Sequence, residues 1–326
     1  MAVAAAGVAP FVVQVMVSVV ALAGGTIMIT RKEAPSMPSI TLWLITGAAL
    51  LFAGFWVGGC SPLTAYNTLA PADAGGAAVQ TDVAYGDHPR QKLDVYAPEN
   101  RTSSAPVVVV IYGGSWNSGN KSDYAFLGKA LSSRGFVAVI ADYRLVPEIR
   151  FPAFLDDTAS AIVWARSHAA QFGGDPEKLY LLGHSAGAYN AVMVALDGRY
   201  LRAAGADPSQ LRGVIGLAGP YDFLPLAVDS TKEAFGKTQD LNTTQPINFA
   251  SRAAPPMLLA TGNDDTTVYP RNTISLAEKL KAAGAAVSVR RYASIGHIGI
   301  LLALSRPLRG TAPVLDDIAS FINGAR

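Results

Sequence analysis

Residues 179–187 read Leu179-Tyr180-Leu181-Leu182-Gly183-His184-Ser185-Ala186-Gly187, an apolar run that passes directly into a glycine-flanked serine. The apolar residues predict a buried strand, and the residues from Ser185 to about Leu196 predict a helix. Gly-x-Ser-x-Gly between a strand and a helix is typical of a sharp turn that exposes a serine hydroxyl as a nucleophile. The alternative is a serine that caps a helix between two glycines. We interpret Ser185 as the nucleophile.

Strands and helices alternate on both sides of this turn. The apolar run Val107–Tyr112 predicts a second strand that is buried on both faces. Besides these strands, at 179–182 and 107–112, strands are expected at 81–85, 91–96, 137–141, 211–217, 257–261 and 287–292, and further helices at 122–133, 156–172, 271–283 and 316–323. This alternation predicts an α/β fold with a mostly parallel sheet covered by helices on both faces. Active sites in such sheets lie at the carboxyl ends of the strands, where Ser185 is placed.

A nucleophilic serine needs a base to take its proton and a carboxylate to orient that base. In this type of fold the chain order is serine, acid, histidine. His297 is the one histidine that follows Ser185, so it is the predicted base. Asp264 and Asp265 both follow the strand at 257–261 and both qualify as the acid, with Asp265 favoured and the other residue expected in a turn. His184 is expected to pack under the serine turn.

Glycines also follow the strand at 107–112, in the sequence Tyr112-Gly113-Gly114-Ser115-Trp116. Acyl transfer places negative charge on the carbonyl oxygen, and backbone amides aimed at that oxygen stabilise it. We assign the oxyanion-hole donors to the amides of Gly114, Ser115 and Ala186, with Gly113 shaping the turn. The alternative for this segment is an ordinary Gly-Gly turn after a strand.

The composition excludes several classes of function. The 326 residues carry a net charge of +2 and no run of basic residues, so nucleic acid is not an expected partner. The single cysteine, Cys60, excludes an internal disulfide and any site built from several cysteines. Four histidines without ligand spacing predict no metal site.

Residues 1–60 differ from the rest because they are almost uncharged. Phe11–Thr30 and Ile40–Gly59 are each about the length of a membrane-spanning helix. One interpretation is therefore a helical hairpin in the membrane. Arg31 and Lys32 would keep its connection in the cytoplasm and place the following chain outside.

The favoured interpretation of this region is a bacterial lipoprotein signal that ends before Cys60, whose thiol would receive the lipid. A start at Met28 would give a conventional signal of this kind. Both interpretations predict a membrane partner and a catalytic domain outside the cytoplasm. We assign residues 61–78 to a linker and residues 79–326 to the catalytic domain.

Residues 80–323 resemble the esterase/lipase branch of the α/β hydrolases, in particular the feruloyl-esterase-like and kynurenine-formamidase-like carboxylesterases, with hormone-sensitive-lipase-like relatives. Besides the serine motif, the similarity includes Asp142-Tyr143-Arg144-Leu145-Val146-Pro147-Glu148, Phe151-Pro152-Ala153, Phe172-Gly173-Gly174-Asp175-Pro176 and Gly219-Pro220-Tyr221-Asp222. Gly262-x-x-Asp265-x-x-Val268 matches the acid loop of the family and supports Asp265 over Asp264. Two positions depart from the family pattern, since Tyr112 replaces a histidine and Ser115 a glycine.

The resemblance implies hydrolysis of carboxylic esters, or less often amides, through an acyl-enzyme with no metal or organic cofactor. Residues 220–254 are the only segment available as a lid, so small to medium acyl groups are expected. An amidase, formamidase or peptidase with the same triad is the first alternative. A non-catalytic hydrolase-like module that binds a lipid or a partner is the second.

Overall fold

The computed structural model describes residues 62–100 and 104–324. The chain divides into two units at the boundary between Ala70 and Pro71. In the first unit, helix α3 (Pro62–Leu69) is the element described. The second unit contains the predicted catalytic domain.

The membrane-related predictions fall on the remaining part of the chain. Phe11–Thr30, Ile40–Gly59 and the lipidation site Cys60 all lie outside the described residues. Within the described residues, no helix combines the length and the apolar character that a membrane crossing needs.

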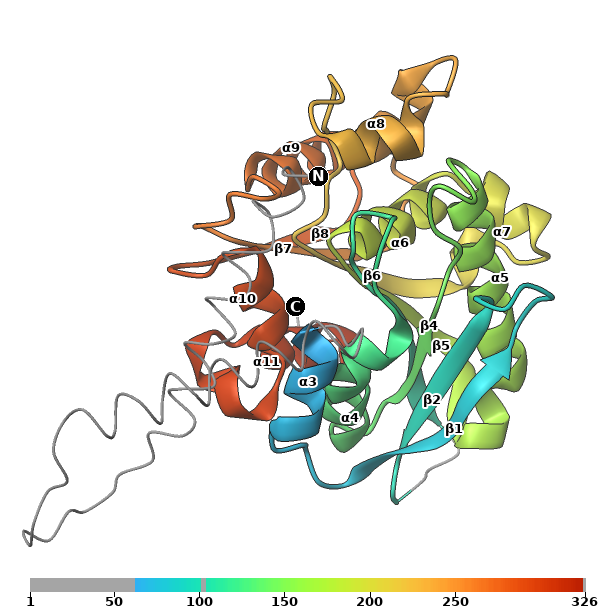
Figure 1. Cartoon of the computed structure of the whole chain (residues 1–326), viewed down its shortest axis with the longest axis vertical. Coiled ribbons are helices and arrows are strands. Elements are labelled where there is room, and N and C mark those ends of the chain that lie inside the picture. Colours follow the sequence, from blue (N-terminus) through green and yellow to red (C-terminus); the bar gives the residue numbers. More distant parts are fainter. Residues whose placement is uncertain (1–61, 101–103, 325–326) are drawn as a thin grey trace, which may run out of the picture. The chain divides into compact units, whose positions relative to one another are not determined.

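An eight-stranded sheet forms the centre of the second unit (Figure 1). Its strands are β1 (Gly76–Ala84), β2 (Lys92–Pro98), β3 (Ala105–Ile111), β4 (Val137–Ala141), β5 (Gly174–His184), β6 (Leu211–Leu217), β7 (Met257–Gly262) and β8 (Val287–Tyr292). They lie in the order β1-β2-β4-β3-β5-β6-β7-β8. β2 pairs antiparallel with both β1 and β4, and every other neighbouring pair is parallel. The predicted mostly parallel sheet is confirmed.

Helices cover the two faces of this sheet. The helices of the second unit are α4 (Ala125–Ser133), α5 (Ala153–His168), α6 (Ala186–Leu196), α7 (Arg199–Ala203), α8 (Asp229–Phe235), α9 (Arg271–Ala282), α10 (His297–Leu302) and α11 (Val314–Ile322). Figure 1 shows α4, α10 and α11 grouped on one side of the sheet, and α5, α6 and α7 on the other. The predicted helical layers on both faces are therefore also confirmed.

The central strands form because their side chains are apolar on both faces. Val107, Val108, Val109 and Val110 of β3 are all fully buried. β-Branched side chains such as valine pack well on a pleated surface, and parallel strands between two helical layers have no solvent-facing side. The same reasoning applies to β4, where all five residues are buried.

The strand register brings the functional loops to one edge of the sheet. Ile111 at the end of β3 pairs with Gly183 of β5, and Leu217 at the end of β6 pairs with His184. Gly262 at the end of β7 pairs with Tyr292 at the end of β8. The loops that follow these parallel strands therefore gather at their carboxyl ends, as the sequence predicts.

Some boundaries differ from the sequence-based expectation. The stretch assigned to a linker, residues 61–78, contains α3 and the first residues of β1. The helices α7, α8 and α10 were not expected. The helix predicted at 122–133 is a short 3₁₀ turn, η1 (Lys121–Tyr124), followed by α4.

Candidate active site

Ser185 occupies a strained turn between β5 and α6. Its φ of 55° and ψ of −123° lie in a region that a non-glycine residue adopts at a cost of about 1–3 kcal/mol. The neighbouring glycines permit the turn: a Cβ on Gly187 would lie 2.1 Å from the Ile111 carbonyl oxygen, and one on Gly183 would lie 2.3 Å from the Gly187 oxygen. The Ser185 amide donates to the Leu217 carbonyl at 2.9 Å, which fixes the turn to β6.

Ser185, His297 and Asp265 come together in the order that the sequence predicts. The Ser185 Oγ lies 2.8 Å from His297 Nε2, and His297 Nδ1 lies 2.8 Å from Asp265 Oδ2. His297 is the first residue of α10, in the loop after β8, and Asp265 lies in the loop after β7. A serine hydroxyl, an imidazole and a carboxylate in this line can pass one proton from oxygen to nitrogen.

The Asp265 carboxylate is fixed on both of its oxygens. Oδ1 accepts hydrogen bonds from the amides of Thr267 at 2.9 Å and Val268 at 2.8 Å, so Oδ2 is left for His297. The Asp265 side chain is fully buried, whereas Asp264 is exposed. Of the two candidate acids, the structure places Asp265 at the histidine and Asp264 in the turn.

The predicted oxyanion loop lies directly against the serine turn. A Cβ on Gly113 would be 2.9 Å from Ser185 Cβ, so only glycine allows this approach. Gly114 has a φ of 136°, and a Cβ there would lie 2.2 Å from the Ser118 carbonyl oxygen. Among the hydrogen bonds of the described residues, none uses the amides of Gly114, Ser115 or Ala186 as donors. These three amides are therefore available to a substrate oxygen.

Trp116 anchors the far end of this loop. Its indole Nε1 donates to Asn190 Oδ1 of α6 at 3.0 Å, and both side chains are buried. Phe235 of α8 packs edge-on against the indole, with ring centroids 4.8 Å apart. Tyr189 also packs edge-on against the indole, at 5.3 Å, and its ring lies 5.2 Å from that of Phe235. Aromatic contacts of this kind add about 0.5–1.5 kcal/mol each beyond their burial, so the tryptophan is a rigid support for the loop.

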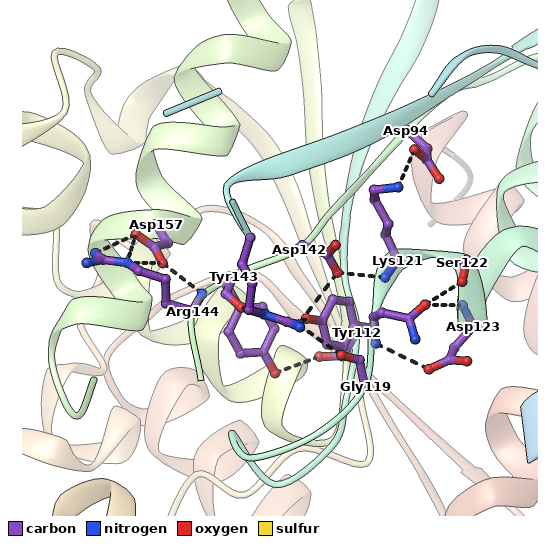
Figure 2. A network of polar contacts seen from close by, with 12 residues as sticks. Asp94, Tyr112, Gly119, Lys121, Ser122, Asp123, Asp142, Tyr143, Arg144 and Asp157 are labelled. Atoms are coloured by element: carbon purple, nitrogen blue, oxygen red, sulfur yellow. Dashed lines mark hydrogen bonds and ion pairs between the residues drawn. The ribbon is translucent and has the colours of Figure 1, made fainter. Parts of the chain in front are cut away.

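Arg90 and Tyr112 support this loop, and Figure 2 labels Tyr112 together with Gly119 and Tyr143, two further partners of Arg90. The Arg90 guanidinium donates to the Tyr112 hydroxyl at 2.5 Å and to the Gly119 carbonyl at 2.9 Å, which are the two ends of the loop. It also donates to the Tyr143 carbonyl at 2.9 Å. The Tyr112 and Tyr143 rings stack with centroids 4.8 Å apart. Tyr112, which departs from the family pattern, therefore provides an acceptor for Arg90.

His184 packs beneath the serine turn, as expected, and it is fully hydrogen-bonded. Its Nδ1 lies 2.8 Å from the Tyr124 hydroxyl, and its Nε2 lies 3.1 Å from the His297 carbonyl oxygen. Burial and the neighbouring imidazole of His297 lower the pKa of His184 to about 3. Burial also raises the pKa of Tyr124, so its hydroxyl keeps its proton. His184 is therefore a neutral imidazole at physiological pH.

Acid should destabilise the protein through His184. Because its pKa is about 3 in the folded protein against 6.5 ordinarily, the unfolded chain binds a proton between these values that the folded chain excludes. As the pH is lowered from about 6.5 toward 3, the free energy of unfolding should therefore decrease by up to about 1.4 kcal/mol per pH unit. We expect His184→Gln to lose less stability than the wild type between pH 6 and pH 4, measured by urea denaturation. Parallel losses would contradict the prediction.

Sequence reasoning missed Arg90, Tyr124 and Asn190. No local motif marks them, because each acts through a partner that is distant along the chain. The sequence separations are 22 residues for Arg90 and Tyr112, 60 for Tyr124 and His184, and 74 for Trp116 and Asn190. Within the described residues, no group of His, Cys, Asp or Glu side chains is arranged to hold a metal ion.

Comparison with known proteins gives a consistent result. The BD-FAE family model matches residues 93–280. A probable isoprenylcysteine alpha-carbonyl methylesterase of Arabidopsis thaliana is 30% identical over 76% of this chain and 56% of its own length. Esterase LipC of Mycobacterium tuberculosis is 30% identical over 74% of this chain and 64% of its own length. The chain thus spans about three fifths of the length of these relatives.

Solved structures show the same fold. Esterase B from Lactobacillus rhamnosis superposes with a TM-score of 0.71 at 18% identity, covering 89% of this chain and 96% of that protein. The expected α/β-hydrolase fold is therefore confirmed for the sheet and its helices.

Proposed function

Because the chain belongs to the BD-FAE family, we propose that it is a serine hydrolase that cleaves carboxylic esters through an acyl-enzyme. The observation that carries this proposal is the continuous line from the Ser185 hydroxyl through His297 to Asp265, with 2.8 Å between each pair of atoms. Ser185 packs against the Gly113 turn, which leads into the amides of Gly114 and Ser115, and it is followed by the Ala186 amide. This combination supplies a nucleophile, a base and an oxyanion site together.

The reaction begins with proton transfer from Ser185. Asp265 Oδ2 accepts the Nδ1–H of His297, so Nε2 is unprotonated and can take the serine proton. The Ser185 Oγ attacks the ester carbonyl carbon, and the resulting oxyanion accepts hydrogen bonds from the loop amides and the Ala186 amide. Loss of one such donor costs about 3–4 kcal/mol in comparable enzymes.

The tetrahedral intermediate then collapses. Its bond to the leaving oxygen breaks, and His297 Nε2–H gives its proton to the departing alcohol. Water enters, His297 takes one of its protons, and the hydroxide oxygen attacks the acyl carbon. In the second intermediate the bond between Ser185 Oγ and the acyl carbon breaks, His297 Nε2–H gives its proton to Oγ, and the carboxylic acid leaves. All groups regain their starting state, and no cofactor is required.

We assign small to medium acyl groups to this site because the cap segment, residues 220–254, is tightly held. The Tyr189 hydroxyl donates to the Thr244 carbonyl at 2.8 Å, and Asn272 Oδ1 accepts from the Tyr221 amide at 3.0 Å. Phe235 in this segment is fully buried. A segment with buried anchors of this kind is poorly suited to the large opening that long-chain fats require.

A substrate panel tests the proposal. We expect the purified protein to hydrolyse p-nitrophenyl acetate and butyrate with a kcat/KM at least roughly tenfold above that for the palmitate ester. The rate with emulsified tributyrin should show no jump above its solubility limit. Faster cleavage of p-nitroacetanilide than of p-nitrophenyl acetate would favour the amidase alternative. No turnover with any of these compounds would favour the binding module.

We further propose that residues 1–60 anchor the protein in a membrane, with the catalytic unit outside the cytoplasm. The support is the pair of uncharged apolar stretches and the position of Cys60 directly after the second. Mass spectrometry of the mature protein from bacterial membranes distinguishes the two forms. A lipid adduct on an N-terminal Cys60 supports the lipoprotein, whereas an intact unmodified N-terminus supports the helical hairpin. Absence of the protein from the membrane fraction would contradict both.

A further inference from the structure

A buried chain of hydrogen bonds joins three parts of the active site. The Gly113 amide lies 3.0 Å from the Tyr124 hydroxyl, which lies 2.8 Å from His184 Nδ1. His184 Nε2 lies 3.1 Å from the carbonyl oxygen of His297. Tyr124 and His184 are only 3% and 2% exposed, so water does not compete for these bonds.

The direction of every bond in this chain is determined by its ends. The Gly113 amide can only donate, so the Tyr124 oxygen accepts there and its own proton must go to His184 Nδ1. The His297 carbonyl can only accept, so His184 Nε2 carries the imidazole proton. His184 is therefore held as one tautomer, and every member of the chain has a partner.

This series of hydrogen bonds connects backbone segments whose relative positions matter for the reaction. Gly113 precedes the predicted oxyanion donors, and His184 precedes the nucleophile. His297 is the proposed base, and the centroid of its ring lies 5.0 Å from the centroid of the His184 ring. His184 is the last residue of β5, whereas His297 follows β8, which is not a neighbour of β5 in the sheet, so no strand pairing ties His297 directly to the serine turn. A bond to the His297 carbonyl therefore restrains the residue whose Nε2 must meet Ser185 Oγ.

From these contacts we infer that Tyr124 and His184 are positioning residues, which hold the base and the oxyanion loop at a fixed separation around Ser185. This inference rests on the proposed esterase function. The competing interpretation is that both side chains only fill the core and satisfy their own polar groups. In that case, their substitution lowers stability without changing the turnover of the molecules that remain folded.

Three substitutions each remove or restore particular hydrogen bonds between Gly113, Tyr124, His184 and His297. Tyr124→Phe removes the hydroxyl and leaves Gly113 and His184 Nδ1 without partners. His184→Gln can place an amide donor where Nε2 was, toward His297, whereas His184→Asn is too short to reach that carbonyl. Tyr180→Phe is a matched control, because the Tyr180 hydroxyl donates to the Ile322 carbonyl at 3.0 Å, away from the triad.

The measurement is kcat and KM for p-nitrophenyl butyrate, with the active fraction of each variant counted by titration with a p-nitrophenyl phosphonate. We expect kcat per titrated site to fall by about ten- to a hundredfold in Tyr124→Phe and His184→Asn, because misplacement by about 1 Å can cost a hundredfold. KM should change little. His184→Gln should recover most of the loss relative to His184→Asn, and Tyr180→Phe should keep the wild-type kcat.

The outcomes separate this inference from the proposed function. If Tyr124→Phe and His184→Asn keep kcat per titrated site within twofold of the wild type, the core-filling interpretation is correct. The same holds if His184→Gln and His184→Asn lose equal turnover, because the bond to His297 would then be irrelevant. If the wild type neither turns over the ester nor reacts with the phosphonate, the proposed function itself fails.

Discussion

Replacing Ser185 with alanine should lower kcat for p-nitrophenyl butyrate by about 10⁴- to 10⁶-fold, the range seen when a triad nucleophile is removed. The substitution deletes the attacking oxygen and leaves His297 without the hydroxyl that lies 2.8 Å from its Nε2. The backbone amides remain, so a small residual rate from water attack is expected. Initial rates measured at high enzyme concentration, with the uncatalysed rate subtracted, give this value.

The matched control is Ser160→Ala. The Ser160 hydroxyl is on α5 and donates to the Asp156 carbonyl within the same helix at 2.9 Å, so its loss should leave the rate unchanged. A phosphonate should add to the wild type and to Ser160→Ala at Ser185, as peptide mass spectrometry would show. Equal rates for Ser185→Ala and the wild type would contradict the assignment of Ser185 as the nucleophile.

The meeting of Ser185, His297 and Asp265 was predictable because each residue is marked by a local motif or by its order along the chain. Ser185 lies in a motif whose strand and helix can be read from apolar spacing. His297 follows from chain order and from the scarcity of histidines. Asp265 shares its loop with Asp264, and only the fold shows which of the two carboxylates is buried against His297.

The supporting residues could not be predicted for a physical reason. Arg90 lies in the β1–β2 connection and binds both ends of the predicted oxyanion loop, and the hydrogen bond from His184 to His297 joins residues 113 positions apart. Such contacts depend on strand order and register, which apolar periodicity does not determine. Tyr112 shows the same limit, because its value as an acceptor depends on a guanidinium from another strand connection.

Secondary-structure boundaries were missed where tertiary contacts outweigh the local pattern. The strand predicted at 179–182 extends as β5 over Gly174–His184, although its first half is polar. Gly174 pairs with Ala105 of β3, and a register shift separates this pair from the regular ladder that begins at Leu179 and Val107. The short helix α10 was not predicted because it begins at His297, and the sequence around this histidine resembles a loop after the last strand.

Asp265→Asn should lower kcat by about 10³- to 10⁴-fold while the protein remains folded. Asp265 Oδ1 accepts two backbone amides, so in the asparagine variant the carbonyl oxygen must occupy that place. The NH₂ group then faces His297 Nδ1 and donates to it. That bond requires Nδ1 to be unprotonated, which moves the imidazole proton to Nε2. A protonated Nε2 cannot accept the Ser185 proton, so the triad holds the wrong tautomer.

Asp264→Asn is the matched control, because it makes the same chemical change one residue away on an exposed side chain. Its kcat should stay within about twofold of the wild type, since a surface substitution leaves the triad geometry in place. Thermal unfolding of both variants should be similar to that of the wild type, because asparagine has the shape of aspartate. A large loss in Asp264→Asn together with near-normal turnover in Asp265→Asn would show that the orienting carboxylate is Asp264. Such a result would require the loop after β7 to rearrange when substrate binds.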